Sequence, residues 1–261
     1  MSFPPWVISV SSYNLLADDY IKPEHYPNVA PEDFLAADRH PKLDARVESL
    51  GTDVVCAQEV TYATFKRLDD RLRPRGYRGR WAHRGGGKPD GCATFVRFPW
   101  TLKASMIVDF DDGPRKPSNR VALLVVAARG PHVCAVANAH FEWSPDDAPE
   151  DQQSGLHQAR QLLSHLGNQR STIVCCDANA THGSLLLKSF EDRGFRDAHD
   201  PSHATFISNG RPRKIDFLLH SSDLESAGTP PPRLSPGAAL PSSSEPSDHL
   251  PLFAEFAPIC A

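Results

Sequence analysis

The sequence lacks long hydrophobic runs, paired cysteines and a strong excess of one charge. No stretch approaches the roughly 18 apolar residues that a membrane-spanning helix requires, and no basic-plus-apolar signal opens the chain. The six cysteines include no CxxC pair, which argues against a zinc site or a disulfide framework. We therefore expect a protein that does not enter a membrane and lies in a reducing, cytoplasmic compartment.

The overall composition is that of an ordinary globular protein. Of the 261 residues, 40% are hydrophobic and 23% are charged, which is enough to bury a sizeable core. We expect a single domain over residues 1–261 and a monomer. The net charge of -4 does not by itself indicate binding to nucleic acid.

The charge is nevertheless spread unevenly along the chain. Nine basic residues and only two acidic ones lie between Lys66 and Lys88. This segment is either a surface that faces phosphate groups or an ordinary solvated helix and loop, and the sequence leaves both interpretations open. Four acidic residues follow Trp143 and would repel a polyanion on that side: Asp146, Asp147, Glu150 and Asp151.

The periodicity of apolar residues predicts an α/β protein. Leu43, Val47 and Leu50 have helical spacing, and Gly51 is placed to end that helix. A second helix over Leu156–Leu166 ends at Gly167 in the same way. Successive strands are expected between residues 93 and 137, with turns at 111–117 and 129–131, and a surface loop at 229–246. This order of elements predicts two packed sheets flanked by helices.

Six short apolar strands end in, contain or follow a carboxylate, amide or imidazole group. Polar groups at the ends of strands can converge on one edge of a sheet, and a buried carboxylate is costly unless it is paired or binds a metal. Together these six strands favour a functional site over solvated loops. The groups are Asn14, Glu59, His140, Asp177 with Asn179, Asp216, and Asp248 with His249.

The chain resembles the endonuclease/exonuclease/phosphatase superfamily, which has the fold of DNase I and the apurinic endonucleases. Three motifs are similar to the branch that holds the poly(A) deadenylases, nocturnin, the Angel proteins and the mitochondrial 2′-phosphodiesterase. They are Ser12 to Asp18, Lys88 to Phe95 and Asn138 to Trp143. The resemblance runs from about Trp6 to Phe256 and implies a four-layer α/β sandwich of two mainly antiparallel sheets flanked by helices.

The resemblance also implies a metal site. Glu59 matches the principal metal ligand of the family, with the amide oxygen of Asn14 close by and Asp248 as a third ligand. Hard oxygen ligands suit Mg²⁺ or Mn²⁺, and a site with few protein ligands leaves positions for water and phosphate oxygens.

The remaining polar residues match the catalytic positions. His249 would act as general base or stabilise the attacked phosphate, and Asp216 would fix its tautomer. Asp177 would orient the attacking water or protonate the leaving oxygen. Two further groups would bind phosphate: Asn179 and His140 by donating hydrogen bonds, and Asn119 with Arg120 as substrate-binding residues.

These residues predict a divalent-metal-dependent phosphoesterase for RNA or nucleotides, with a short single-stranded or end-type substrate. One alternative is a phosphatase for 2′,3′-cyclic phosphate or 2′-phosphate groups on RNA ends or small nucleotides. Another is a 3′-5′ exoribonuclease of the deadenylase type. A different class, a non-catalytic binding module on the same fold, is disfavoured because all eight polar positions at the strand ends are present together.

Overall fold

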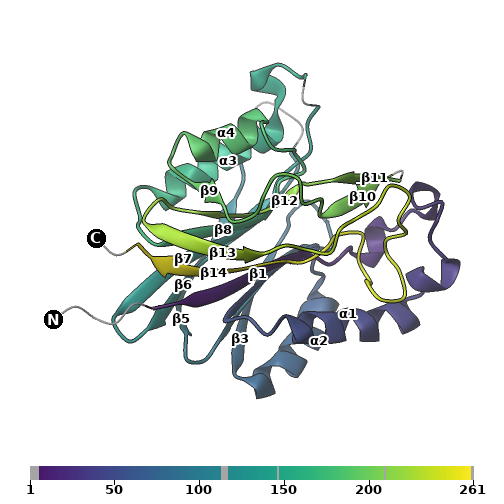
Figure 1. Ribbon diagram of the computed structural model, residues 1–261, viewed down its shortest axis with the longest axis horizontal. Helices are drawn as coiled ribbons and strands as arrows, with labels where there is room; N and C mark the ends of the chain where they lie inside the picture. The colour runs from purple at the N-terminus through teal and green to yellow at the C-terminus, as the bar shows by residue number, and fades with distance from the viewer. Residues whose placement is uncertain (1–5, 113–116, 146, 209, 260–261) are drawn as a thin grey trace.

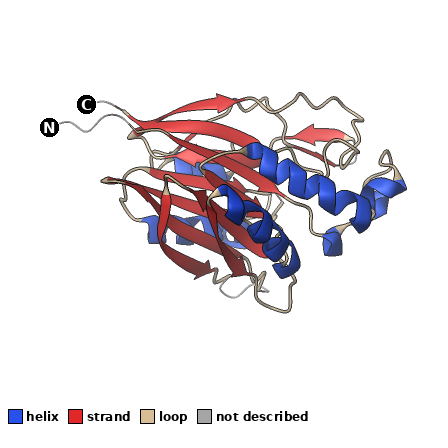
Figure 2. Cartoon of the chain, turned by 90° about the horizontal axis from the view of Figure 1, so that it is seen from below, coloured by secondary structure: helices blue, strands red, loops and turns tan. Residues whose placement is uncertain are grey.

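Two six-stranded sheets pack face to face, and helices cover the outer face of each (Figures 1 and 2). This computed structural model describes residues 6–112, 117–145, 147–208 and 210–259. Its layers confirm the expected sandwich of two mainly antiparallel sheets between helices.

The first sheet contains the N-terminal strand and the last strand of the chain. Only β1 and β2 are parallel in it, and the other neighbours are antiparallel. The outer face of this sheet is covered by α1 (Ala36–Leu50) and α2 (Tyr62–Leu72). Its strands, in spatial order, are β13 (Leu224–Thr229), β14 (Leu252–Pro258), β1 (Ile8–Asn14), β2 (Val54–Gln58), β4 (Gly91–Arg97) and β3 (Tyr77–His83).

The second sheet is built in the same way. Its one parallel pair is β7 and β8, and α3 (Ser154–Leu166) and α4 (Leu185–Glu191) cover its outer face. A small hairpin of β10 (Phe206–Ser208) and β11 (Arg211–Arg213) belongs to neither six-stranded sheet. The strands of the second sheet, in spatial order, are β5 (Thr101–Asp109), β6 (Val121–Arg129), β7 (His132–His140), β8 (Thr172–Asp177), β12 (Asp216–His220) and β9 (Arg196–Asp197).

The two parallel pairs decide where polar side chains gather. Parallel neighbours need a crossover, and here α1 connects β1 to β2 while α3 connects β7 to β8. The carboxyl ends of parallel strands lie at the same edge of a sheet. Asn14 is therefore in register with Gln58, and His140 is in register with Asp177.

Three apolar layers hold the elements together. Side chains such as Ile8, Val54 and Leu218 fill the space between the sheets, and separate clusters lie under each helix pair. Near the edge described above, Gln58 Nε2 donates to Asn138 Oδ1 over 2.8 Å, and Asn138 Nδ2 donates to the carbonyls of Ala57 and Ala93. These amides join the two sheets, because a buried polar group must find a partner inside the protein.

Most sequence expectations for the elements are confirmed. Gly51 ends α1 with a left-handed φ of 61°, and Gly167 follows α3 with a φ of 57°. The expected loop begins after β13, which ends at Thr229. Asp216 opens β12 and does not lie in its middle. The expected turn at 111–117 falls largely on residues 113–116, which lie outside the described residues, as does Asp146 of the acidic stretch.

The cysteines and helices of the described residues agree with the sequence. Cys56, Cys92, Cys134, Cys175 and Cys176 are free and buried in strands. No helix in the part of the chain that the structure describes is long and apolar enough to span a membrane.

The basic stretch between Lys66 and Lys88 is largely neutralised by ion pairs. Arg67 donates to Asp44, and Arg71 donates to Glu48, so that α2 is bound to α1 by charge as well as by apolar contact. The ordinary solvated-helix interpretation therefore holds for most of the segment. Six of the nine basic residues are paired: Lys66, Arg67, Arg71, Arg73, Arg75 and Arg84.

Candidate functional site

The polar residues predicted from the sequence meet at the carboxyl ends of the two parallel strand pairs. Asn14 ends β1, His140 ends β7 and Asp177 ends β8, while Glu59 follows β2 directly. Asp216 lies opposite Asp177 in the antiparallel pair of β12 and β8. Asp248 and His249 come from the loop before β14. The site thus contains side chains from both sheets.

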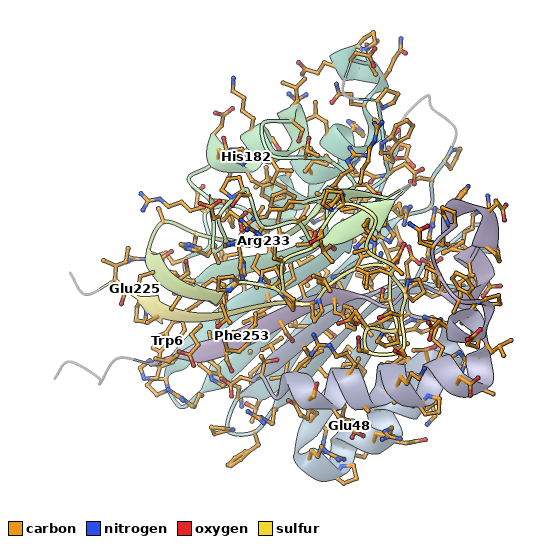
Figure 3. All side chains as sticks on the ribbon, turned by 45° about the vertical axis from the view of Figure 1, so that its right-hand side comes forward. Trp6, Glu48, His182, Glu225, Arg233 and Phe253 are labelled. Carbon is orange, nitrogen blue, oxygen red and sulfur yellow. The ribbon has the colours of Figure 1, made fainter. Side chains whose placement is uncertain are left out.

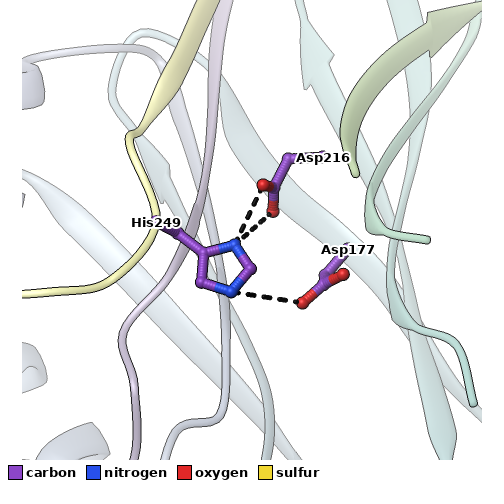
Figure 4. Close-up of side chains that lie close together, drawn as sticks. All are labelled: Asp177, Asp216 and His249. Carbon is purple, nitrogen blue, oxygen red and sulfur yellow. Dashed lines mark hydrogen bonds and ion pairs between the residues drawn. The ribbon is translucent and has the colours of Figure 1, made fainter. Parts of the chain in front are cut away.

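His249 is held between two aspartates (Figure 4). Its Nδ1 lies 3.1 and 2.9 Å from the two carboxylate oxygens of Asp216. A carboxylate only accepts, so Nδ1 carries a proton. The Nε2 atom on the opposite side of the ring lies 3.8 Å from Asp177 Oδ2. The arrangement fixes the ring and leaves Nε2 facing the site.

Burial and neighbouring charges shift the pKa values of His249 and Asp177. Burial lowers the pKa of His249, but Asp216, Asp248 and Asp177 outweigh burial and raise it well above the usual range. Burial raises the pKa of Asp177 to about 6, against the attraction of His249. The surrounding carboxylates therefore favour the protonated, charged form of His249.

A second group of residues is centred on Glu59, which accepts hydrogen bonds from them. Asn14 Nδ2 donates to Glu59 Oε1 over 3.2 Å and to Asp177 Oδ2 over 2.8 Å, so it links the two carboxylates. Asn14 Oδ1 accepts from the backbone N–H of Leu16 at 3.0 Å, and its predicted role as an amide-oxygen ligand stays a prediction. Glu59 Oε2 accepts from the N–H of Ala17 over 2.9 Å.

This second group has the chemistry of a cation site. Burial, and next to it the charge of Asp248, raises the pKa of Glu59 to about 7. Asp248 Oδ2 accepts from Tyr26, whereas Asp248 Oδ1 is buried, accepts no hydrogen bond and lies 3.8 Å from His249 Nε2. Two neighbouring buried carboxylates repel each other, and a cation between them would relieve that repulsion. Glu59 and Asp248 therefore fit a hard divalent ion.

A further triplet of ligand atoms lies nearby. Asp177, Asp216 and His249 offer atoms within 4.8 Å of one another, a spacing that could also hold a metal ion. His249 Nδ1 and both oxygens of Asp216 are already committed to each other. The Glu59 and Asp248 group, in which Asp248 Oδ1 accepts no hydrogen bond, is therefore the better candidate for the cation.

His140 is oriented by Arg120. The guanidinium Nη1 lies 2.7 Å from His140 Nδ1, and Arg120 Nε donates to Glu142 Oε2 over 2.8 Å. An arginine does not give up its proton, so Nδ1 accepts and the ring proton sits on Nε2. The Nε2–H faces the acceptor Asp177 Oδ2 at 3.5 Å, whereas Asn179 Nδ2, 2.9 Å from Nε2, is itself a donor and donates to the carbonyl of Phe141 over 3.0 Å. Burial, followed by Arg120, lowers the pKa of His140 well below its usual range, which keeps this donor neutral.

The structure places the two predicted substrate-binding residues differently. Arg120 lies within the site, although two of its donors are engaged by His140 and Glu142. Asn119 has a left-handed φ of 56°, and its Nδ2 donates to the carbonyl of Pro117 over 3.3 Å. The substrate-binding roles of both residues stay predictions.

Backbone conformations that are rare for residues with side chains gather here. In the described residues, five non-glycine residues have positive φ, and four of them lie in or beside the site. Such conformations cost about 1–3 kcal/mol each and are kept where the surroundings determine them. The four are Leu16, Glu59, Asn119 and Asn179.

Sequence analysis missed two residues that hold the site together. Tyr26 donates from its hydroxyl to Asp248 Oδ2 over 2.8 Å, from a segment with no regular periodicity. Arg39 is almost fully buried on α1 and donates to the carbonyls of Leu15, Leu16 and Pro246. Arg39 precedes Leu43 and Val47 by one and two helical turns, so an arginine on the apolar stripe was an available signal.

The sequence model of the endonuclease/exonuclease/phosphatase family matches residues 11–249 of this chain. The chain belongs to this family. Among curated proteins, it is similar to "Carbon catabolite repressor protein 4 homolog 6" of Arabidopsis thaliana, with 27% identity over 70% of this chain and 27% of that protein. It is also similar to "Protein angel homolog 2" of Danio rerio, with 29% identity over 72% of this chain and 36% of that protein.

These relatives confirm the branch of the family that the motifs predicted. The chain nevertheless matches only 27% and 36% of the length of the two proteins. Among solved structures, the fold matches the 2′,3′-cyclic phosphatase ANGEL2 in complex with adenosine-2′,3′-vanadate. That match has a TM-score of 0.78 and covers 97% of this chain and 96% of the other, at 19% sequence identity. At this identity the match confirms the fold.

Proposed function

We propose that the protein is a divalent-metal-dependent phosphoesterase that hydrolyses phosphate ester bonds at RNA ends or in nucleotides. The observation that carries this proposal is the pairing of His249 with Asp216 and Asp177 directly beside Glu59 and Asp248. One group can hold a proton, and the other can hold a cation. Proton transfer and a bound cation each lower the barrier to hydrolysis of a phosphoester.

Glu59 and Asp248 would hold the cation, with Asn14 beside them. A bound Mg²⁺ or Mn²⁺ would neutralise charge on the phosphate and on the leaving oxygen. Asn14 Nδ2 keeps Glu59 and Asp177 at a fixed separation through its two hydrogen bonds.

The remaining residues bind phosphate and move protons. His140, with its proton on Nε2, and Asn179 donate hydrogen bonds to phosphate oxygens. Asp177, and not His249 as expected from the sequence, accepts a proton from the attacking water as the new phosphorus–oxygen bond forms. His249 donates from Nε2 to the oxygen that leaves, or stabilises the charge on the phosphate, while Asp216 holds the ring in place.

We favour a terminal phosphate as the substrate. The fold matches ANGEL2, a 2′,3′-cyclic phosphatase, over nearly the whole length of both chains. Most cations of the Lys66–Lys88 stretch are neutralised by ion pairs, so a long phosphate-binding groove has little support there. A 3′-5′ exoribonuclease is the second candidate, because one relative is named as a homolog of carbon catabolite repressor protein 4.

A panel of substrates separates these candidates. It contains RNA that ends in a 2′,3′-cyclic phosphate, RNA that ends in a 2′-phosphate, poly(A) with a free 3′ hydroxyl, NADP and duplex DNA, each with Mg²⁺ and with Mn²⁺. We expect turnover of a terminal phosphate on RNA and loss of that turnover in His249→Ala. Shortening of poly(A) with no action on terminal phosphates would favour the exoribonuclease. A complete lack of turnover with both metals would favour the binding module.

The expected oligomeric state, domain count and compartment of the protein belong to the same proposal. A monomer, a single domain over residues 1–261 and a reducing cytoplasmic compartment stay predictions from the sequence. Sedimentation of the purified protein tests the first of them directly.

A further inference from the structure

Three aromatic rings form a partly exposed row beside Glu59. The ring of Tyr62 lies 5.4 Å from that of Trp81, and the ring of Trp81 lies 5.1 Å from that of His83. Tyr62 is 59% exposed, Trp81 is half-buried and His83 is exposed. The row runs from the start of α2 along the outer face of β3, two neighbouring elements at the bottom of Figure 1.

Local hydrogen bonds fix each ring of the row. Thr61 caps α2 by accepting from the N–H of Thr64, which leaves Tyr62 at the exposed first position of the helix. Trp81 Nε1 donates to the carbonyl of Val60 over 2.8 Å, and His83 Nε2 lies 2.8 Å from the carbonyl of Lys88. The rings are therefore held in place before any ligand arrives.

The row is joined to the catalytic edge through the backbone. Val60, which follows Glu59, donates its N–H to the carbonyl of Gly91 over 3.0 Å, and Gly91 pairs with His83 between β4 and β3. His83 thus lies at the same edge of the first sheet as Glu59. A chain whose end is bound at the catalytic residues could extend over this row.

The unpaired cations of the basic stretch lie on the same strand and loop. Within the described residues, Arg78, Arg80 and Lys88 take part in no ion pair, in contrast to the other six cations of that stretch. All three side chains are exposed. Arg78 and Arg80 are on β3, where they share the face of Ala82, opposite to Trp81 and His83, and Lys88 is the residue whose carbonyl lies against His83.

We propose that Tyr62, Trp81 and His83 form a stacking surface for the bases of single-stranded RNA next to the reactive end, with Lys88 close to its phosphates. Every base has a flat face that stacks on aromatic rings, and exposed rings beside unpaired cations suit a single strand. A purely apolar peptide would make no use of those cations. The inference rests on the proposed function for the identity of the strand and adds how that strand is held.

The first experiment measures binding without turnover. Fluorescently labelled single-stranded RNA of about six nucleotides is titrated in EDTA against the wild-type protein, Tyr62→Ala and His83→Ala. We expect each alanine variant to bind about tenfold more weakly, and the conservative Tyr62→Phe to bind like the wild type. Phe98→Ala removes a 73% exposed aromatic at the opposite end of β4 and is the matched control.

The second experiment measures turnover against substrate length. For the longer RNA, KM should rise about tenfold in Tyr62→Ala and His83→Ala with kcat unchanged, and both constants for a dinucleotide should stay unchanged. Lys88→Ala should flatten the salt dependence of binding, whereas Tyr62→Ala should not.

The two proposals fail in different ways. Unchanged binding of the six-nucleotide RNA in both alanine variants would overturn the stacking surface, as would equal binding of duplex RNA, whose bases are not available. Equal losses for the dinucleotide and the longer RNA would also overturn it, because the rings would then serve the reactive end itself. A wild-type protein that binds RNA through the rings but hydrolyses no phosphate ester would leave the surface standing and remove the proposed function.

Discussion

The two parallel strand pairs present similar residues at the same edge, but their side chains are satisfied differently. At the end of β7 and β8, His140 is oriented by Arg120, and Asp177 accepts from Asn14 and from the N–H of Asn179. At the end of β1 and β2, Glu59 has its pKa raised to about 7, and the neighbouring Asp248 keeps one oxygen that accepts no hydrogen bond. The side chains at the end of β7 and β8, the second pair, find their hydrogen-bond partners within the protein. Glu59 at the end of β1 and β2, the first pair, is arranged with Asp248 for a cation.

The largest expected effect comes from Glu59, the carboxylate at the end of β1 and β2. Glu59→Gln keeps the size of the side chain and removes its charge, so it should lower turnover by about a thousandfold or more at limiting Mg²⁺. Circular dichroism and the thermal midpoint should stay close to those of the wild type. Glu225→Gln, on exposed β13 near the chain termini (Figure 3), is the matched control and should have no effect. Near-wild-type turnover in Glu59→Gln would remove Glu59 from the cation site.

The next effect concerns His249, which comes from the loop before β14 and faces Asp177 of the second pair. His249→Ala should cost about 10²–10⁴ in kcat, in the range expected for a lost acid or base. Asp216→Asn should cost less, because the ring remains but loses its orienting carboxylate at 2.9 Å. The double variant should be little worse than His249→Ala, since the two residues act as a unit. Strictly additive losses in log kcat would show that Asp216 acts independently of His249.

These contrasts explain what the sequence could and could not predict. Asn14, Glu59, His140 and Asp177 were accessible because each follows an apolar strand, and parallel strands bring their carboxyl ends together. Helix ends at Gly51 and Gly167 were accessible for a similar local reason. Each of these signals lies within one short segment of the chain.

Other features depend on contacts between distant segments. Tyr26 meets Asp248 across 222 positions of the chain, and no local pattern encodes that hydrogen bond. The pairing of the α2 cations with carboxylates of α1 likewise depends on how the two helices pack. The sequence therefore left the role of the basic stretch open, and only the packing separates Arg80 and Lys88 from their paired neighbours.

The protonation of Glu59 gives a pH dependence to cation binding. Its pKa is raised from an ordinary value of 4.5 to about 7, so the folded protein holds a proton there that the unfolded chain has lost. The stabilisation from this proton is complete below about pH 4.5 and is lost as pH rises through 7. A cation must displace the proton, so its affinity should increase by up to about tenfold per pH unit between pH 5 and 7.

Thermal unfolding with and without Mg²⁺ measures this dependence without any substrate. The increase in thermal midpoint on adding Mg²⁺ should be larger at pH 8 than at pH 6 in the wild-type protein. In Glu59→Gln the increase should be small at both pH values. An equal shift at pH 6 and pH 8 in the wild type would show that Glu59 is ionised without the cation.

The smallest expected effect comes from the hydrogen bond that Tyr26, which lies outside the strands, donates to Asp248. Burial and the charge of Asp248 raise the pKa of Tyr26 far above its usual range, so its hydroxyl stays a donor to Asp248 Oδ2. Tyr26→Phe removes only this donor and leaves the ring against Phe34, at a centroid distance of 5.6 Å. A ligand carboxylate that loses such support typically binds its metal about tenfold more weakly. The half-saturating Mg²⁺ concentration should therefore rise by about tenfold, while kcat at saturating Mg²⁺ stays close to the wild-type value. A loss of kcat that Mg²⁺ does not restore would instead place Tyr26 with the proton-transfer residues, and the division of the site between its two strand pairs would no longer hold.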